Sequence, residues 1–330
     1  MNFFSVKKVI KLGVLSILLM ISSASHAKPS FNEYVQALKI EALSKGFDST
    51  LVEQAFSQVS YRQSAVKADK NQPETKVTLD SYLATRVPDW KVKQAIDLLA
   101  ENIQLLDAVE QQFGVQKRFI VALWGNESNF GKFMGKHPVL TSLVTLAYDG
   151  RRETFFKKQV FAALTILEQG HIELDDFVGS WAGAMGQSQF MPSSFLSYAI
   201  DFDGDGKKDI WSNKADVFAS IANFLKSEGW SNEHTWGRQV KIPDGFNASY
   251  IGLNRSDMKI LNEWQGLGVK RHNGKNLPSV ELKASLIAPD GVKGRAYLVY
   301  ENFHTLMKWN RSSYFGISVS YLSERIKKGA

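Results

Sequence analysis

The sequence predicts a mainly α protein of the α+β class, with a small β-containing region towards its C-terminal end. Apolar residues recur at spacings of three and four over residues 91–113 and again over 117–127, the periodicity of amphipathic helices. Residues 281–288 and 296–300 are instead strand-like, and Pro289-Asp290-Gly291 between them is a turn signature. The composition, 44% hydrophobic and 12% aromatic, can form a sizeable core in one large or two modest domains.

Residues 1–27 have the pattern of a secretory signal peptide. Three lysines accompany an apolar run at residues 12–21, and Ser25-His26-Ala27 supplies a small-residue cleavage site. The apolar run is too short to span a bilayer comfortably, which argues against the alternative of a retained membrane anchor. We therefore expect export to the periplasm and removal of this segment.

Cysteine usage and charge exclude several classes of site. The chain has no cysteine, so disulfides, cysteine–zinc sites and a lipid anchor on an N-terminal cysteine are excluded. Removal of the leader lysines reduces the formal charge of +7 to a mild excess, and no basic stripe is interleaved with aromatics. We expect no nucleic-acid partner, whereas an acidic polymer suits this charge.

The chain after the signal peptide is predicted to be helical over most of its length. Residues 30–59 indicate two short helices with a turn at Gly46, and the polar, aperiodic residues 60–78 indicate a surface loop. The periodic segment 91–113 ends at Gly114, a usual C-terminal stop. Further helices are predicted at 117–127, 151–169, 192–199, from Asp216 as N-cap to Glu228, and from Ser312 onward.

These patterns divide the chain into four segments. The signal peptide (1–27) precedes a helical N-terminal part and core (28–240). A small β-region (241–300) and a C-terminal helix (301–330) that returns to the core complete the chain.

Glu127 is the candidate catalytic residue. It extends the apolar stripe of Phe119 and Leu123, and Trp124 and Phe130 flank it. Loss of hydration in such a setting disfavours the charged form and raises the pKa, as a general acid working near neutrality requires. The alternative is a structural Glu that bends back to a helix terminus or pairs with an arginine.

The segment Gly183–Pro192 is the candidate ligand-binding wall. Its glycines would let the backbone approach a bulky ligand closely. Gln187 and Gln189 offer amide groups of the kind that bind hydroxyl and acetamido groups. Together with Glu127 the segment indicates an enzyme that cuts a sugar polymer. No partner carboxylate stands out, so one acid would both donate and later accept a proton.

Residues 201–209 have the spacing of a calcium-binding loop. Asp201, Asp203, Asp205 and Asp209 supply side-chain oxygens, and Lys207 would supply its carbonyl. Ser212 stands where a bidentate Glu is usual, and Asp216 could supply the missing carboxylate. The alternative is a solvated Asp/Gly turn. We expect a structural Ca²⁺ and no organic cofactor. The histidines show no zinc-type spacing, and no G-x-S-x-G elbow or phosphate loop is present.

Three long motifs resemble the lytic murein transglycosylase B family (glycoside hydrolase family 103). They are residues 179–194 (Gly-Ser-Trp-Ala-Gly-Ala-Met-Gly-Gln-Ser-Gln-Phe-Met-Pro-Ser-Ser), Asp201–Trp211 and Trp309–Ser312. They follow the family's order, and the match covers nearly all of the mature chain. The resemblance implies a lysozyme-like helical catalytic core, a helical N-terminal part and a small β-region.

The resemblance also implies a substrate and a reaction. The substrate would be peptidoglycan, cut between N-acetylmuramic acid and N-acetylglucosamine. The muramyl C6 hydroxyl rather than water would attack C1 and form a 1,6-anhydro end. Glu127 would protonate the glycosidic oxygen and then accept the hydroxyl proton, while the substrate's acetamido group supports the positive centre.

Further site residues are carried over from the family's motifs. The family's namesake is a lipoprotein, whereas this chain lacks the cysteine for such an anchor, so we expect release into the periplasm. The implied substrate-binding residues are Ser180, Gln189, Asn310, Tyr314 and Tyr82. The implied calcium ligands are Asp201, Asp203, Asp205 and Asp216, with the carbonyl of Lys207.

Two other functions remain open from the sequence. The same cleft could act as a hydrolytic muramidase, or the protein could bind peptidoglycan without cleaving it. The intact setting of Glu127 argues against a pure binder, which has no need of a buried acid. We expect a monomer that acts on glycan strands, with other cell-wall enzymes as candidate partners.

Overall fold

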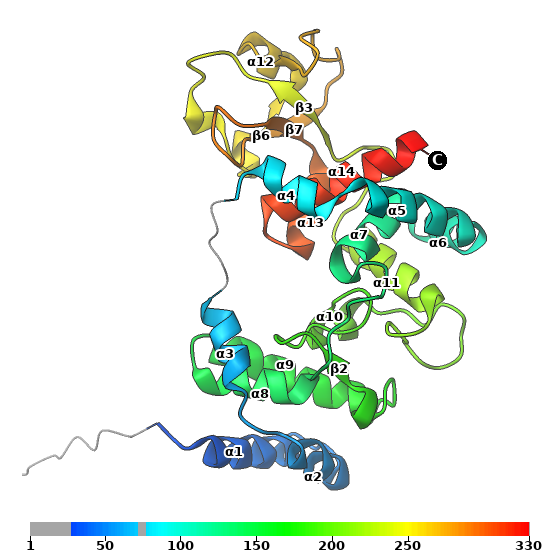
Figure 1. Ribbon diagram of the computed structural model, residues 1–330, viewed down its shortest axis with the longest axis vertical. Helices are drawn as coiled ribbons and strands as arrows, with labels where there is room; N and C mark the ends of the chain where they lie inside the picture. Colours follow the sequence, from blue (N-terminus) through cyan, green and yellow to red (C-terminus); the bar gives the residue numbers. More distant parts are fainter. Residues whose placement is uncertain (1–27, 72–76, 330) are drawn as a thin grey trace, which may run out of the picture.

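The computed structural model describes residues 28–71 and 77–329 (Figure 1). The predicted signal peptide lies outside the described residues. The described chain is mainly helical and carries one five-stranded and one two-stranded sheet, which confirms the predicted fold class. Within the described residues, no helix is both long and apolar enough to cross a bilayer.

The N-terminal part contains four short helices. They are α1 (Phe31–Ser44), α2 (Ser49–Ser57), α3 (Gln63–Lys70) and α4 (Leu79–Arg86). The first two confirm the predicted pair with a turn at Gly46, which has a φ of 90°. The prediction of a loop over residues 60–78 was wrong, because α3 lies within it. This helix is too short for its apolar residues to show a helical periodicity. Contacts with another part of the chain stabilise it, since Arg151 and Arg152 each form an ion pair at 2.5 Å with its buried Asp69.

Three helices lead to the candidate catalyst. They are α5 (Asp89–Glu101), α6 (Ile103–Phe113) and α7 (Lys117–Ser128). The single helix predicted over residues 91–113 is in fact two. The helix breaks at Asn102, whose side-chain amide donates to the carbonyl of Leu98 at 2.7 Å and so competes with helix continuation. The predicted helix at 117–127 is confirmed as α7.

The central part adds the helices α8 (Val139–Asp149), α9 (Glu153–Glu168), α10 (Pro192–Tyr198) and α11 (Lys214–Ser227). The sequence did not predict α8, because residues 139–147 are all buried and no polar face marks a helical period. Asp216 is not the N-cap of α11 as predicted. Asn213 takes that place and accepts from the backbone N–H of Ala215 at 2.9 Å. Asp216 lies inside the first turn and is fully buried.

The β-region forms a small sheet with its own core. Its elements are β3 (Gly237–Lys241), β4 (Lys259–Ile260), α12 (Leu261–Gly266), β5 (Lys270–Arg271), β6 (Lys283–Ile287) and β7 (Ala296–Val299). The strands are antiparallel in the order β4-β6-β7-β3-β5. Trp264 fills the core and donates its indole N–H to the carbonyl of Ala284 at 2.9 Å. The strands predicted at residues 281–288 and 296–300 correspond to β6 and β7.

The C-terminal residues return to the helical core as two helices. They are α13 (Glu301–Trp309) and α14 (Ser313–Gly329), whereas one helix was expected over this segment. Figure 1 shows α14 beside α4, and α14 also packs against α5, α7 and α13. The short connection between α13 and α14 therefore lies near the end of α7. Elsewhere β1 (His137–Pro138) pairs with β2 (Val178–Gly179) just before the segment Gly183–Pro192.

Candidate active site

Glu127 lies in the last turn of α7, at a sharp change of chain direction. Asn129 and Phe130 directly after it both have positive φ values, 50° and 60°. These are strained values for residues other than glycine, and such strain is often found at functional sites. The turn brings Phe130 back against Trp124, with ring centroids 5.3 Å apart. A Cβ at position 125 would lie 2.6 Å from the ring of Phe130, so this turn requires Gly125. Aromatic rings thus enclose the helix end that carries the carboxyl group.

Among the described residues, the Glu127 carboxyl accepts one hydrogen bond. The indole Nε1–H of Trp309 donates to its Oε1 at 2.6 Å. Loss of hydration raises the pKa of Glu127 to about 7, although the Trp309 hydrogen bond and the charge of Arg86 both oppose this rise. Both protonation states are therefore populated near neutral pH. A residue that must first donate and then accept a proton needs this balance.

Trp309 also favours one carboxyl oxygen as the carrier of the proton. An indole N–H can donate but cannot accept, and a carbonyl oxygen accepts more strongly than a protonated one, so this contact favours the proton on Oε2 in the acid form. Trp309 is itself held by Phe190 and Phe224, whose ring centroids lie 5.2 and 4.7 Å from its own. The sequence placed Trp309 in a family motif but gave no signal of this contact, which joins residues 182 positions apart.

Gln187 has a structural role and does not face a ligand. Its Oε1 accepts from the indole N–H of Trp124 at 2.7 Å, and its Nε2 donates to the carbonyl of Trp211 at 2.8 Å. The expectation that both glutamines of this segment serve a ligand is wrong for Gln187, since both ends of its amide are engaged. Gln187 instead links α7 to the loop that follows residue 201.

The glycines of the segment Gly183–Pro192 allow close packing within the protein. A Cβ at position 183 would lie 2.5 Å from the side chain of Leu143, and one at position 186 would lie 2.6 Å from the carbonyl oxygen of Ile210. Both glycines have positive φ values, 84° and 63°. The expected close approach is therefore real, but the neighbour is the protein itself.

Ser180 and Gln189 retain free hydrogen-bonding capacity at this segment. Ser180 Oγ accepts from the N–H of Ala184 at 3.0 Å, which leaves its hydroxyl proton able to donate. Gln189 has a φ of 50°, and its Nε2 donates to the carbonyls of Met134 and Gly186 at 3.1 and 2.9 Å. Among the described residues, no donor reaches its Oε1, so this oxygen can accept from a ligand. Both side chains are half-buried.

Tyr82 and Tyr314 come together from α4 and α14. Their rings meet edge to face with centroids 5.5 Å apart, and the Tyr314 hydroxyl donates to Asp290 in the turn before β7. Asn310 is exposed and directly follows Trp309, whose indole contacts Glu127. Tyr82 and Tyr314 therefore lie on two helices that pack together, and Asn310 lies in the connection between α13 and α14.

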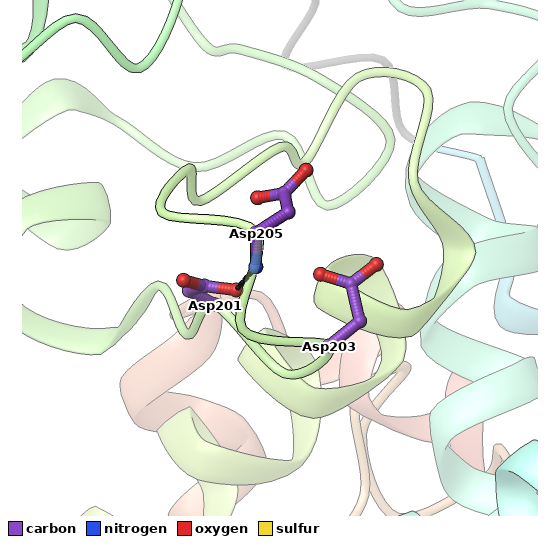
Figure 2. A group of neighbouring side chains, drawn as sticks. All are labelled: Asp201, Asp203 and Asp205. Atoms are coloured by element: carbon purple, nitrogen blue, oxygen red, sulfur yellow. Dashed lines mark hydrogen bonds between the residues drawn. The ribbon is translucent and has the colours of Figure 1, made fainter.

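Three carboxylates converge in the loop after α10. Asp201, Asp203 and Asp205 each offer an oxygen within 4.8 Å of the others. Figure 2 shows the three side chains on this loop. Asp201 also accepts from the backbone N–H groups of Gly204 and Gly206 at 2.8 and 2.9 Å, which folds the loop around it. A cluster of carboxylate oxygens suits a hard cation such as Ca²⁺ better than a transition metal.

Two other predicted ligands brace the backbone of the loop. Asp209 accepts from the N–H groups of Trp211 and Ser212 at 2.8 and 2.9 Å. Asp216 accepts from the N–H groups of Phe202 and Asp209 at 2.8 and 2.7 Å. Both carboxylates thus satisfy backbone donors and are not part of the cluster formed by the other three.

Replacement of Glu127 by Gln should change the pH dependence of stability. The raised pKa means that Glu127 contributes stability below its unfolded value of 4.5 that is lost as the pH rises through about 7. Gln cannot ionise. The free energy of unfolding of Glu127→Gln, relative to the parent chain, should therefore increase by on the order of 1–3 kcal/mol across this interval. Denaturant unfolding measured across the interval tests this, and a pH-independent difference would contradict it.

Comparison with known proteins identifies the family. The family described as "Transglycosylase SLT domain" matches residues 30–324. Membrane-bound lytic murein transglycosylase B of Escherichia coli K12 is 30% identical over 297 residues, which are 85% of this chain and 79% of that protein.

Solved structures agree with this match. The crystal structure of SltB3 from Pseudomonas aeruginosa in complex with NAG-anhNAM-pentapeptide has a TM-score of 0.86 and 42% identity, and the alignment covers 90% of this chain and 80% of that one. The Escherichia coli lytic transglycosylase SLT35 in complex with calcium has a TM-score of 0.76 and 25% identity, covering 90% and 93% of the two chains. The chain therefore belongs to the transglycosylase SLT family, the family of the lytic murein transglycosylases.

Proposed function

We propose that this enzyme cleaves the β-1,4 bond between N-acetylmuramic acid and N-acetylglucosamine in peptidoglycan and leaves 1,6-anhydro ends. The observation that carries the proposal is the carboxyl of Glu127, whose pKa of about 7 suits both proton donation and proton acceptance. Membership of the family supports it, as does the anhydromuramyl ligand bound by SltB3. A hydrolase of the usual kind would instead need a second carboxylate.

The reaction proceeds in two steps that share one carboxyl group. In the first, the proton on Glu127 Oε2 passes to the glycosidic oxygen as its bond to muramyl C1 breaks. The N-acetylglucosamine leaves with a new 4-hydroxyl group, and the substrate's acetamido group supports the positive centre at C1. The Trp309 N–H stabilises the carboxylate that has formed.

In the second step the muramyl C6 hydroxyl attacks C1. Glu127, now a carboxylate, accepts the hydroxyl proton as the O6–C1 bond forms, which returns the enzyme to its starting state. No water is consumed. Ser180 and Gln189 would hold the muramyl residue through their free donor and acceptor, and Tyr82, Asn310 and Tyr314 would contact the strand from the C-terminal side.

The three-aspartate loop would hold a structural Ca²⁺. Asp201, Asp203 and Asp205 would be its ligands, with the carbonyl of Lys207 as a fourth. The ion would neutralise mutual repulsion and fix the residues that follow. Ile210 and Trp211 then offer their carbonyls to Gln187, so the loop supports the wall beside Glu127. The calcium in SLT35 supports this assignment.

We place the enzyme in the periplasm. The sequence of residues 1–27 supports export, because it has the three regions of a signal peptide in the usual order. The periplasm is also where a peptidoglycan substrate is accessible.

Mass analysis of digested peptidoglycan tests the reaction. The expected products are disaccharide units lighter by one water than muramidase products, with no new reducing ends. Glu127→Gln should reduce the rate by about 10²–10⁴-fold, the usual contribution of general acid–base catalysis. New reducing ends would favour the hydrolytic muramidase, and binding without any product would favour the non-catalytic alternative.

Thermal unfolding with and without Ca²⁺ tests the metal site. Added Ca²⁺ at about 100 times its dissociation constant should stabilise the chain by about 2.7 kcal/mol, and a chelator should reverse the effect. Asp203→Asn removes a predicted ligand that otherwise accepts only from the Asn213 side chain, so it should abolish this response. Asp244→Asn, an exposed substitution outside the loop, is the control. Equal melting temperatures with Ca²⁺ and with chelator would exclude the site.

A further inference from the structure

A groove between α1, α9 and α10 lies apart from the site of Glu127. Its volume is about 680 Å³, within the range of about 300–1,000 Å³ that is usual for ligand pockets. Figure 1 shows α1 and α9 on the opposite side of α10 from α7, the helix that carries Glu127. A ligand in this groove would therefore not occupy the reaction centre.

The floor of the groove is apolar and partly open to water. Phe47, in the turn between α1 and α2, and Phe161 of α9 stack with their ring planes 13° apart and their centroids 6.4 Å apart. Leu196 of α10 continues this surface, and all three residues are only half-buried. The apolar groups of a ligand would displace water from a concave surface of this kind.

Positive charge is in excess along the groove. It is lined by three lysines, Lys45, Lys157 and Lys158, together with one acid, Glu41. The Glu41 carboxyl contacts Lys157 at 2.5 Å and Lys45 at 3.6 Å, so two ammonium groups share one carboxylate. Lys158 is exposed and, among the described residues, has no ion-pair or hydrogen-bond partner. An anion in the groove would therefore meet uncompensated positive charge.

Hydroxyl groups supply hydrogen-bond acceptors on the α9 and α10 sides. Thr165 donates its hydroxyl proton to the carbonyl of Phe161 at 3.1 Å, and Ser197 donates to the carbonyl of Ser193 at 3.0 Å. Each hydroxyl oxygen therefore keeps lone pairs for an incoming N–H donor. The groove thus combines an apolar floor, unbalanced cations and acceptors for amide groups.

This combination matches a short peptide that carries carboxylates. Carboxylates complement the lysines, small apolar side chains complement the floor, and backbone N–H groups complement the hydroxyl oxygens. A glycan chain offers hydroxyl and acetamido groups, which have no need of an excess of cations. In peptidoglycan, the stem peptides are the part that carries such carboxylates.

We propose that this groove binds a stem peptide of peptidoglycan outside the catalytic cleft and so anchors the enzyme to the polymer. The inference rests on the proposed function, because it takes peptidoglycan as the polymer on which the enzyme works. Two sites that engage one polymer raise the overall affinity above that of either site, provided that both can be occupied at once. The groove and Glu127 lie on different sides of α10, so a ligand at one does not block the other.

Titration with a free stem pentapeptide, which has no sugar, tests the site. In the nitrogen-15-labelled parent chain, the amide resonances of Phe47, Phe161 and Ser197 should shift on binding. Amidation of the peptide carboxylates should weaken the affinity roughly tenfold or more, the scale of a hydrogen bond to a charged group. Shifts confined to the catalytic cleft, or equal affinity for both peptides, would overturn the inference. Shifts at the same amides that depend on protein concentration alone would assign the groove to a second copy of the chain and overturn it as well.

Charge reversal separates a contact with the lysines from general electrostatic attraction. Lys45→Glu/Lys158→Glu should weaken pentapeptide binding by at least the same factor, and both side chains are exposed, so the fold should be retained. Lys241→Glu/Lys270→Glu, on the paired strands β3 and β5, changes the net charge equally at exposed positions and is the matched control. This control should leave the affinity unchanged. An equal loss in both variants would show an effect of net charge alone and contradict the site.

Retention on insoluble peptidoglycan tests the anchoring role. Glu127→Gln, which should cut the polymer slowly, should be retained at least several-fold more strongly than Glu127→Gln combined with the Lys45 and Lys158 reversals. Peptide-free polymer should retain both equally. Equal retention on the intact polymer would contradict anchoring. Failure of the proposed function is distinct, because the parent chain would then yield no anhydro product, whereas the pentapeptide titration requires no cleavage.

Discussion

The hydrogen bond between Trp309 and Glu127 is the interaction on which the rest of the site depends. Burial alone would keep the carboxyl protonated and make it a poor base, whereas free hydration would keep it ionised and make it a poor acid. One N–H donor inside an aromatic enclosure holds the pKa near 7, between these limits. It also favours the proton on the other oxygen. A single carboxyl can therefore serve both halves of the reaction.

Distant parts of the chain are arranged to maintain this contact. The return of α13 and α14 onto α7 brings Trp309 to Glu127 across 182 positions, and Phe190 and Phe224 fix the indole from two further elements. Gln187 joins the catalytic helix to the aspartate loop. The aspartate loop thus contacts the segment that contains Phe190, and Phe190 in turn packs against Trp309. The charge of Arg86, at the end of α4, also lowers the pKa of Glu127.

Sequence patterns predicted those features that depend on local spacing. Helix α7, strands β6 and β7 and the aspartate loop each leave a periodic or spaced signature. Helix α8 leaves none, because it is buried on all sides. The break at Asn102 and the N-cap of α11 each depend on one side-chain hydrogen bond. Several residues in each region could have formed such a bond, so the sequence did not indicate which one does. The burial of Glu127 could be expected from the apolar residues on its side of the helix. The hydrogen bond from Trp309, which lowers the Glu127 pKa, could not.

Direct titration of the Glu127 carboxyl tests this account most simply. Carbon-13 NMR of the labelled glutamate side chains, with Glu127→Gln to assign the resonance, gives the pKa without any substrate. We expect about 7 in the parent chain and a higher value in Trp309→Phe, which keeps a ring but loses the donor. A Glu127 pKa near the ordinary 4.5, or one that Trp309→Phe leaves unchanged, would contradict the account.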